Sequence, residues 1–78
     1  MNIGLAIKIE RTKRRLKQSD LARIVGLSTA YISLVENNKR ELSMTSYFKI
    51  CKALHALPGD VMIAAEEFKL ADSDRYAV

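Results

Sequence analysis

Residues 18–36, "QSDLARIVGLSTAYISLVE", constrain the fold of this chain more than any other segment. Apolar residues recur at helical spacing over 18–25 and again over 29–36, and only three residues separate the two stretches. Gly26 predicts the end of the first helix, because glycine takes the left-handed conformation that commonly closes a helix. Ser28 is a favourable N-cap for the second helix. The residues expected to face the interior are Leu21, Ala22, Val25, Ile32 and Val35. We therefore expect two short helices joined by a tight turn.

The rest of the chain also shows helical periodicity, and no stretch alternates between apolar and polar residues as a strand would. We expect further helices over 3–15, 44–56 and 58–70, each with an apolar face. Residues 71–78 show no periodicity, which predicts a flexible tail. The chain is therefore predicted to be all-α, a five-helix bundle that forms one domain over residues 1–70.

Positive charge is concentrated in the first half of the chain. Residues 1–40 contain nine basic and three acidic side chains, whereas residues 41–78 contain four basic and six acidic ones. The net charge of +4 therefore comes from the first half, and we expect only this half to face a polyanion such as nucleic acid. Charged residues also cover the solvated faces of ordinary helices, so charge alone leaves both interpretations open.

The sequence offers little for catalysis or metal binding. Cys51 and His55 are the sole cysteine and histidine, and together they provide too few soft ligands for a metal site. A hydroxyl nucleophile would depend on His55 as the only histidine base. The chain is thus not expected to be an enzyme, to bind a metal or a cofactor, or to respond to a small-molecule ligand.

Neither a signal peptide nor a transmembrane segment is expected. The amino terminus places apolar residues before basic ones, which is the reverse of a secretory signal. The longest apolar run, "VMIAA" at 61–65, is far shorter than the about 20 residues that a transmembrane helix needs. A single cysteine allows no internal disulfide. We expect a cytoplasmic protein with no membrane partner.

A tight turn containing glycine between two short helices is the helix-turn-helix arrangement. Around it, from residue 3 to about residue 57, the chain resembles the phage repressor and Cro-like (XRE-type) family of DNA-binding proteins. The matching residues are, in order, Ile3-Gly4, Ile7, Arg11, Leu16, Gln18, Leu21-Ala22, Gly26-Leu27-Ser28, Ile32-Ser33, Glu36-Asn37, Ser43 and "ICKAL" at 50–54. The resemblance implies a five-helix fold of the lambda-repressor type. It also implies double-stranded DNA as the partner and a homodimer that places two recognition helices about 34 Å apart on a roughly palindromic operator.

Phosphate contacts are implied on both sides of the helix-turn-helix. Gln18 opens the first helix of the motif, where free backbone N–H groups attract a phosphate, and Asn37 has the matching place after the second helix. Asn38 replaces a glycine common in the family's loop, and asparagine tolerates the positive φ that such a turn needs. Ser28 is expected mainly to cap the second helix of the motif and, in addition, to contact a phosphate. The full set expected to contact phosphates is Lys17, Gln18, Ser28, Asn37, Asn38, Lys39 and Arg40.

The second helix of the motif is expected to lie in the major groove, and helical spacing turns five of its side chains away from the core. None of them is Arg, Asn or Gln, the side chains that bind a base through two hydrogen bonds. Specificity is therefore expected from van der Waals and water-mediated contacts, from DNA shape and from paired half-sites. Leu34 either touches a thymine methyl group or lies outside the contact area. The expected base contacts are Thr29, Ala30, Tyr31, Ser33 and Leu34.

Three residues are expected to serve the fold alone. Arg11 and Glu36 match an ion pair that, in this family, ties the first helix to the end of the third. Removing one partner of such a buried pair strands the other charge, so we expect Arg11 to stabilise the protein and not to contact DNA. Cys51 takes a small apolar place where a buried, inert thiol is expected.

The last helix, expected over 58–70, is apolar on more than one face and needs a second surface to cover it. A homodimer provides that surface. In the alternative, the core of the same chain covers part of the apolar surface of this helix. The residues expected at the dimer interface are Phe48, Met62, Ile63 and Phe68.

The sequence leads to one main hypothesis and one rival. The main hypothesis is a small dimeric transcriptional regulator, similar to stand-alone Cro-like proteins and to restriction–modification controller proteins, whose own concentration controls operator occupancy. The rival is an antitoxin or adaptor that binds a partner protein through its last two helices, with DNA binding secondary. A steep fall of DNA affinity with salt favours the first hypothesis, and a flat response favours the second.

Overall fold

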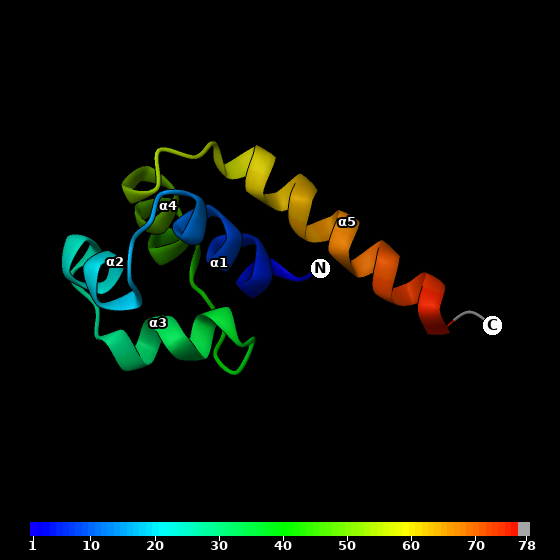
Figure 1. Ribbon diagram of the computed structural model, residues 1–78, viewed down its shortest axis with the longest axis horizontal. Helices are drawn as coiled ribbons and strands as arrows, with labels where there is room; N and C mark the ends of the chain where they lie inside the picture. The colour runs from blue at the N-terminus through cyan, green and yellow to red at the C-terminus, as the bar shows by residue number, and fades with distance from the viewer. Residues whose placement is uncertain (77–78) are drawn as a thin grey trace.

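The computed structural model describes residues 1–76 of the chain, and the side chains of residues 1–68. The described residues form five helices and no strand (Figure 1). The helices are α1 (Ile3–Lys13), α2 (Gln18–Val25), α3 (Thr29–Glu36), α4 (Met44–Ala53) and α5 (Pro58–Tyr76). The predicted all-α class is confirmed, and α2 and α3 have the predicted bounds.

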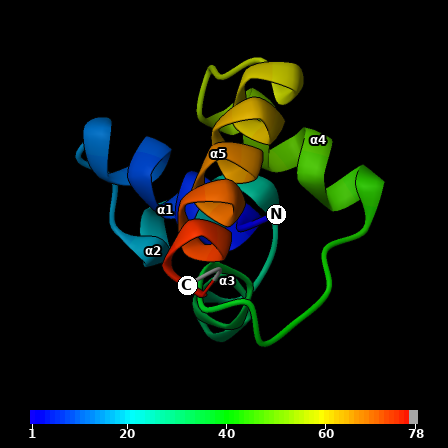
Figure 2. The same ribbon diagram turned by 90° about the vertical axis from the view of Figure 1, so that its right-hand side faces the viewer.

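Helices α1 to α4 form a body from which α5 extends (Figure 1). Helix α1 packs against α3 and α5, α2 packs against α3 and α4, and α4 packs against α5. Figure 2, in which α5 points toward the viewer, shows α3 at the lower edge of the molecule with α4 above it. Helix α3 therefore has a face that no other helix covers.

Two groups of buried apolar side chains form the core. The first lies among α1 to α4 and contains Ile7, Leu21, Ala22, Ile32, Val35, Ile50 and Leu54. The second lies under α5 and contains Ala6, Tyr47, Cys51, Val61 and Ala65. The Tyr47 hydroxyl joins α4 to the start of α5 by donating to the carbonyl of Pro58 at 2.6 Å. Cys51 is buried, as predicted, and burial raises the pKa of its thiol.

Helices α1 and α4 end two or three residues earlier than predicted. Arg15 (φ 57°) and His55 (φ 52°) take the left-handed conformation just beyond these helices and close them. That conformation is typical of glycine, so an arginine and a histidine gave no signal for a helix end in the sequence. The predictions of helices over 3–15 and 44–56 are corrected accordingly.

Helix α5 is longer than predicted: it was expected to end at residue 70 and it continues to Tyr76. No glycine or proline follows Gly59, so nothing in the sequence interrupts the helix after its first turn. Of the predicted flexible tail, residues 71–76 are helical and residues 77–78 lie outside the described residues. Weak hydrophobic periodicity is thus not a reliable sign of a helix end.

Candidate nucleic-acid interface

Helices α2 and α3 form the predicted helix-turn-helix, and its turn is closed at both ends. Gly26 ends α2 at φ 73°, a conformation that favours glycine. The N–H of Leu27 donates to the carbonyl of Ala22 at 2.9 Å. The Ser28 hydroxyl caps α3 by accepting from the N–H of Tyr31, 3.0 Å away. These bonds fix the direction in which α3 leaves α2.

One face of α3 is buried and the opposite face is free. Its buried residues are Ile32, Val35 and Glu36. Among the residues predicted to contact bases, the exposed ones are Thr29, Ala30 and Leu34, and the half-buried ones are Tyr31 and Ser33. Leu34 is 42% exposed, which leaves it available to a thymine methyl group. The free face of α3 therefore carries no charged side chain.

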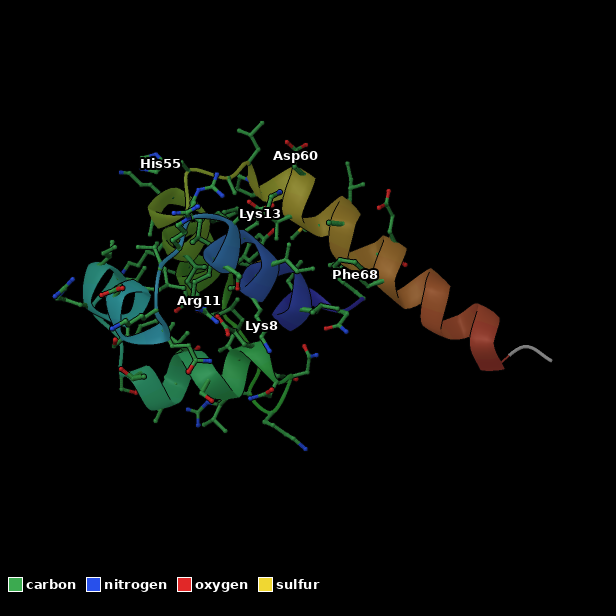
Figure 3. The ribbon with its side chains drawn as sticks, in the orientation of Figure 1. Lys8, Arg11, Lys13, His55, Asp60 and Phe68 are labelled. Atoms are coloured by element: carbon green, nitrogen blue, oxygen red, sulfur yellow. The ribbon has the colours of Figure 1, made fainter. Side chains whose placement is uncertain are left out.

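An ion pair between α1 and α3 fixes the helix-turn-helix on the body. The Nε of Arg11 donates to one carboxylate oxygen of Glu36 at 2.6 Å, and its Nη2 donates to the other at 3.0 Å. The Glu36 side chain is only 1% exposed. The Gln18 amide adds a third bond to this carboxylate at 3.0 Å, which brings α2 into the same network. Figure 3 shows Arg11 on the side of α1 that faces α3.

Lys17 and Gln18 lie at the start of α2, where a phosphate contact is predicted. Lys17 is exposed, and its backbone N–H donates to the Asp20 carboxylate at 2.9 Å. The Gln18 amide is turned inward to Glu36, so its side chain serves the fold. The first N–H groups of any helix have no partner within the helix and favour an anion. A phosphate at this end can therefore bind backbone N–H groups together with the Lys17 ammonium group.

Asn37 and Asn38, which follow α3, are hydrogen-bonded within the protein. The Asn37 amide donates to the carbonyl of Ser33 at 2.9 Å. The Asn38 amide donates to the side-chain oxygen of Asn2 at 2.7 Å, and the Asn38 oxygen accepts from the N–H of Gly4 at 3.2 Å. Asn38 has φ 57°, the positive value predicted for this turn. Because Asn38 joins the loop to the start of α1, we do not include it among the proposed phosphate contacts.

Two residues at the start of α1, Asn2 and Gly4, hold this helix against α3. The Asn2 side chain caps α1. A Cβ atom on Gly4 would lie 2.5 Å from the carbonyl oxygen of Val35 and 2.6 Å from that of Glu36. Only glycine permits two backbones to approach this closely. Neither residue was predicted to have a structural role. An asparagine before an apolar run is a recognisable cap signal, whereas nothing local marks a close approach.

Lys39 and Arg40 are exposed in the loop between α3 and α4. Neither forms an ion pair within the described part of the chain. The Arg40 guanidinium lies over the ring of Tyr31, 5.7 Å from its centroid. The loop thus places two unpaired positive charges next to the free face of α3.

Helices α4 and α5 carry exposed apolar side chains, as the other helices also do. Phe48 is 50% exposed and Ile63 is 61% exposed. Met62 and Phe68 are half-buried against the core of their own chain, and Figure 3 shows Phe68 on the inner side of α5. A groove of about 310 Å³ between α4, α5 and the amino terminus is lined by Met1, Ile3, Glu41, Leu42, Met44, Tyr47 and Met62. Two of the four predicted dimer contacts are therefore free, and two partly serve the fold.

The closed turn, the buried ion pair and the free face of α3 define the class of a helix-turn-helix DNA-binding domain. The chain belongs to the Helix-turn-helix family, whose sequence model matches residues 7–60. YozG of Bacillus subtilis (strain 168), an uncharacterized HTH-type transcriptional regulator, is 32% identical over 63 residues, which are 80% of this chain and 75% of YozG. Antitoxin HipB of Escherichia coli O6:H1 (strain CFT073) is 41% identical over 49 residues, which are 63% of this chain and 52% of HipB.

Solved structures of regulators have the same fold. The clp gene regulator ClgR from Corynebacterium glutamicum superposes with a TM-score of 0.95 at 25% identity, over 97% of this chain and 81% of ClgR. The restriction-modification controller protein C.AhdI from Aeromonas hydrophila has a TM-score of 0.74 at 30% identity, over 77% of this chain and 91% of C.AhdI. SinR, the master regulator for biofilm formation, was solved in complex with DNA. Its TM-score is 0.72 at 26% identity, over 77% of this chain and 97% of SinR.

The predicted resemblance is therefore confirmed, including the similarity to controller proteins. Within the described residues, no helix combines the length and the apolar character that a bilayer span requires.

Proposed function

We propose that this protein is a transcriptional regulator that inserts α3 into the major groove of a specific DNA site. The observation that supports this function most is the free, uncharged face of α3, flanked by the start of α2 and by the loop at residues 39–40. A helix fits the major groove, and its first turns reach the base edges when the flanking elements are bound to phosphates. The similarity to SinR, which was solved with DNA, supports the same function.

The charged phosphate contacts proposed for each protomer come from lysines that form no ion pair with the described side chains. Lys17 lies just before α2, and Lys39 lies in the loop just after α3. Asn37 and Ser28 contribute polar groups there, although each already forms a hydrogen bond within the chain. The proposed base contacts on α3 are Thr29, Ala30, Ser33 and Leu34. Tyr31 lies at the edge of the surface that these residues form.

The salt dependence of DNA binding tests this function. A site is first selected from a pool of random duplexes, and its affinity is then measured between 50 and 200 mM salt, the range in which phosphate contacts are most visible. Lys17 and Lys39 on two protomers neutralise four phosphates, which predicts a slope of log K against log salt of about −3.6 or steeper. Lys39→Ala should weaken binding to every sequence alike and make the slope shallower by about two. Binding that does not change with salt would contradict the proposal.

We also propose that the regulator binds its operator as a homodimer formed through α4 and α5. Phe48 and Ile63 are apolar and exposed, and the groove beside Met62 offers space for an apolar side chain of a second copy. Burial of such a patch stabilises association by roughly 25 cal/mol per Å² of apolar surface. Two copies related by a twofold axis present two recognition helices, which matches a palindromic site.

Ile63→Glu should convert the dimer to a monomer, because the charge would be buried at the centre of the apolar interface without a partner. Ile24→Glu is the matched control, since Ile24 is 55% exposed but lies on α2, away from the proposed interface. Sedimentation equilibrium measures the mass of each variant. The proposed interface is wrong if Ile63→Glu remains dimeric or if Ile24→Glu dissociates the protein as well.

The similarity to HipB, which is named an antitoxin, supports the rival function to a lesser degree. In that case the apolar surface of α4 and α5 binds a different protein, and the DNA site serves a second role. The regulator function predicts that the DNA duplex contacts α3, whereas the rival predicts a protein partner on α4 and α5, and amide chemical shifts measured with the selected duplex separate the two.

A further inference from the structure

We propose that Arg40 contacts a guanine in the major groove, from a position that Tyr31 fixes, and that it does not act as a phosphate contact. This inference rests on the proposed DNA-binding function. Helix α3 contains no Arg, Asn or Gln from residue 29 to residue 35, so no side chain of its free face can form two hydrogen bonds to one base. Arg40 provides such a side chain from outside the helix.

The backbone after α3 folds back along the helix and brings Arg40 to it. The N–H of Asn38 donates to the carbonyl of Val35 at 3.1 Å, and the N–H of Lys39 donates to the carbonyl of Leu34 at 2.8 Å. The positive φ of Asn38 makes this reversal possible. As a result, the Arg40 guanidinium lies 5.7 Å from the ring centroid of Tyr31, nine residues earlier in the chain.

Tyr31 is a firm support for this guanidinium. Its side chain is half-buried and packs against the core group that contains Ile32, and its backbone N–H is bonded to Ser28. Helical spacing places Tyr31 beside Leu34, three residues later, at the edge of the free face. Arg40 is therefore held at the border of the surface that the proposed function assigns to the bases.

The position of Arg40 over the Tyr31 ring leaves the N–H groups of its guanidinium available. The attraction between a cation and an aromatic face uses the positive charge and does not require these N–H groups as donors. The ion pairs among the described side chains involve Arg11, Lys13, Arg14 and Arg23, so no carboxylate there occupies Arg40. Guanine presents two acceptors, N7 and O6, at the spacing that this fork matches. Among the described side chains, Lys39 has no aromatic partner and differs from Arg40 in this respect.

Two adjacent substitutions, Arg40→Ala and Lys39→Ala, form the test. Each removes one exposed positive charge, so neither disturbs the core, and circular dichroism confirms that the helices are retained. Affinities are measured for the selected duplex and for duplexes in which each G·C pair of a half-site is changed to A·T. Arg40→Ala should abolish the preference at one G·C pair, a loss of discrimination of roughly 5- to 150-fold, and keep the other preferences. Lys39→Ala should lower all affinities by one common factor. Tyr31→Leu should reduce the preference at the same G·C pair as Arg40→Ala.

The outcomes separate this inference from the function on which it rests. If Arg40→Ala lowers all affinities by one factor, as Lys39→Ala does, or leaves every base preference intact, the guanine contact is wrong and the regulator function stands. If the wild-type protein selects no sequence from the pool, the proposed function fails and the inference fails with it.

Discussion

Arg11→Ala is expected to lower the free energy of unfolding by about 3–5 kcal/mol, because it leaves the Glu36 carboxylate buried without its main partner. Two hydrogen bonds, at 2.6 and 3.0 Å, join these side chains, and Glu36 is 1% exposed. The Gln18 amide remains, but one neutral donor does not compensate a buried charge. A domain of this size should lose about 12–40 °C in melting temperature, measured by circular dichroism.

Lys13→Ala on the same helix is the control for Arg11→Ala. Lys13 pairs with Glu10 at 3.3 Å, but its side chain is 64% exposed, and exposed pairs contribute about 0–1 kcal/mol. The melting temperature of this variant should therefore stay close to that of the wild type. Equal effects of the two substitutions would show that the Arg11–Glu36 pair has no special structural role.

Gly4→Ala is expected to destabilise the protein by about 1–3 kcal/mol, although alanine is the better helix former. The added Cβ would lie 2.5 Å from one backbone carbonyl oxygen of α3 and 2.6 Å from the next. Backbone atoms cannot move aside as a flexible side chain can, so α1 and α3 must separate. The bond from the N–H of Gly4 to Asn38 weakens at the same time. Denaturant titration measures the loss.

Gly59→Ala is the matched control for Gly4→Ala. Gly59 also lies in the first turn of a helix, but a Cβ there meets no atom within 4 Å. Replacing it should stabilise the protein by up to about 1 kcal/mol, since alanine has the higher helix propensity. Opposite signs for the two substitutions support the close contact between α1 and α3. A stabilising Gly4→Ala would contradict it.

The fold was largely predictable because the local signals agree with one another. Gly26 and Ser28 mark the ends of two helices, and the structure uses both residues as the sequence indicates. The ends of α1 and α4 could not be predicted, since Arg15 and His55 take a conformation that is uncommon for their residue types.

The candidate site was predictable in its elements, but less so in the roles of individual side chains. The positions of α2 and α3 follow from spacing, and so does the exposure of Thr29 and Leu34. The inward turn of Gln18 and the position of Arg40 over the Tyr31 ring depend on tertiary contacts, which helical spacing does not reveal. Charge patterns locate the interface, whereas tertiary contacts decide which polar groups remain free to bind.

The central claim, that α3 faces the DNA, is tested most directly by amide chemical shifts of the isotope-labelled protein during titration with the selected duplex. We predict the largest changes at the start of α2, at residues 29–34 and at residues 39–40, with the core of α5 unchanged. Changes confined to α4 and α5, with α3 unaffected, would contradict the claim, and a duplex that changes no amide shift would favour the protein-binding rival.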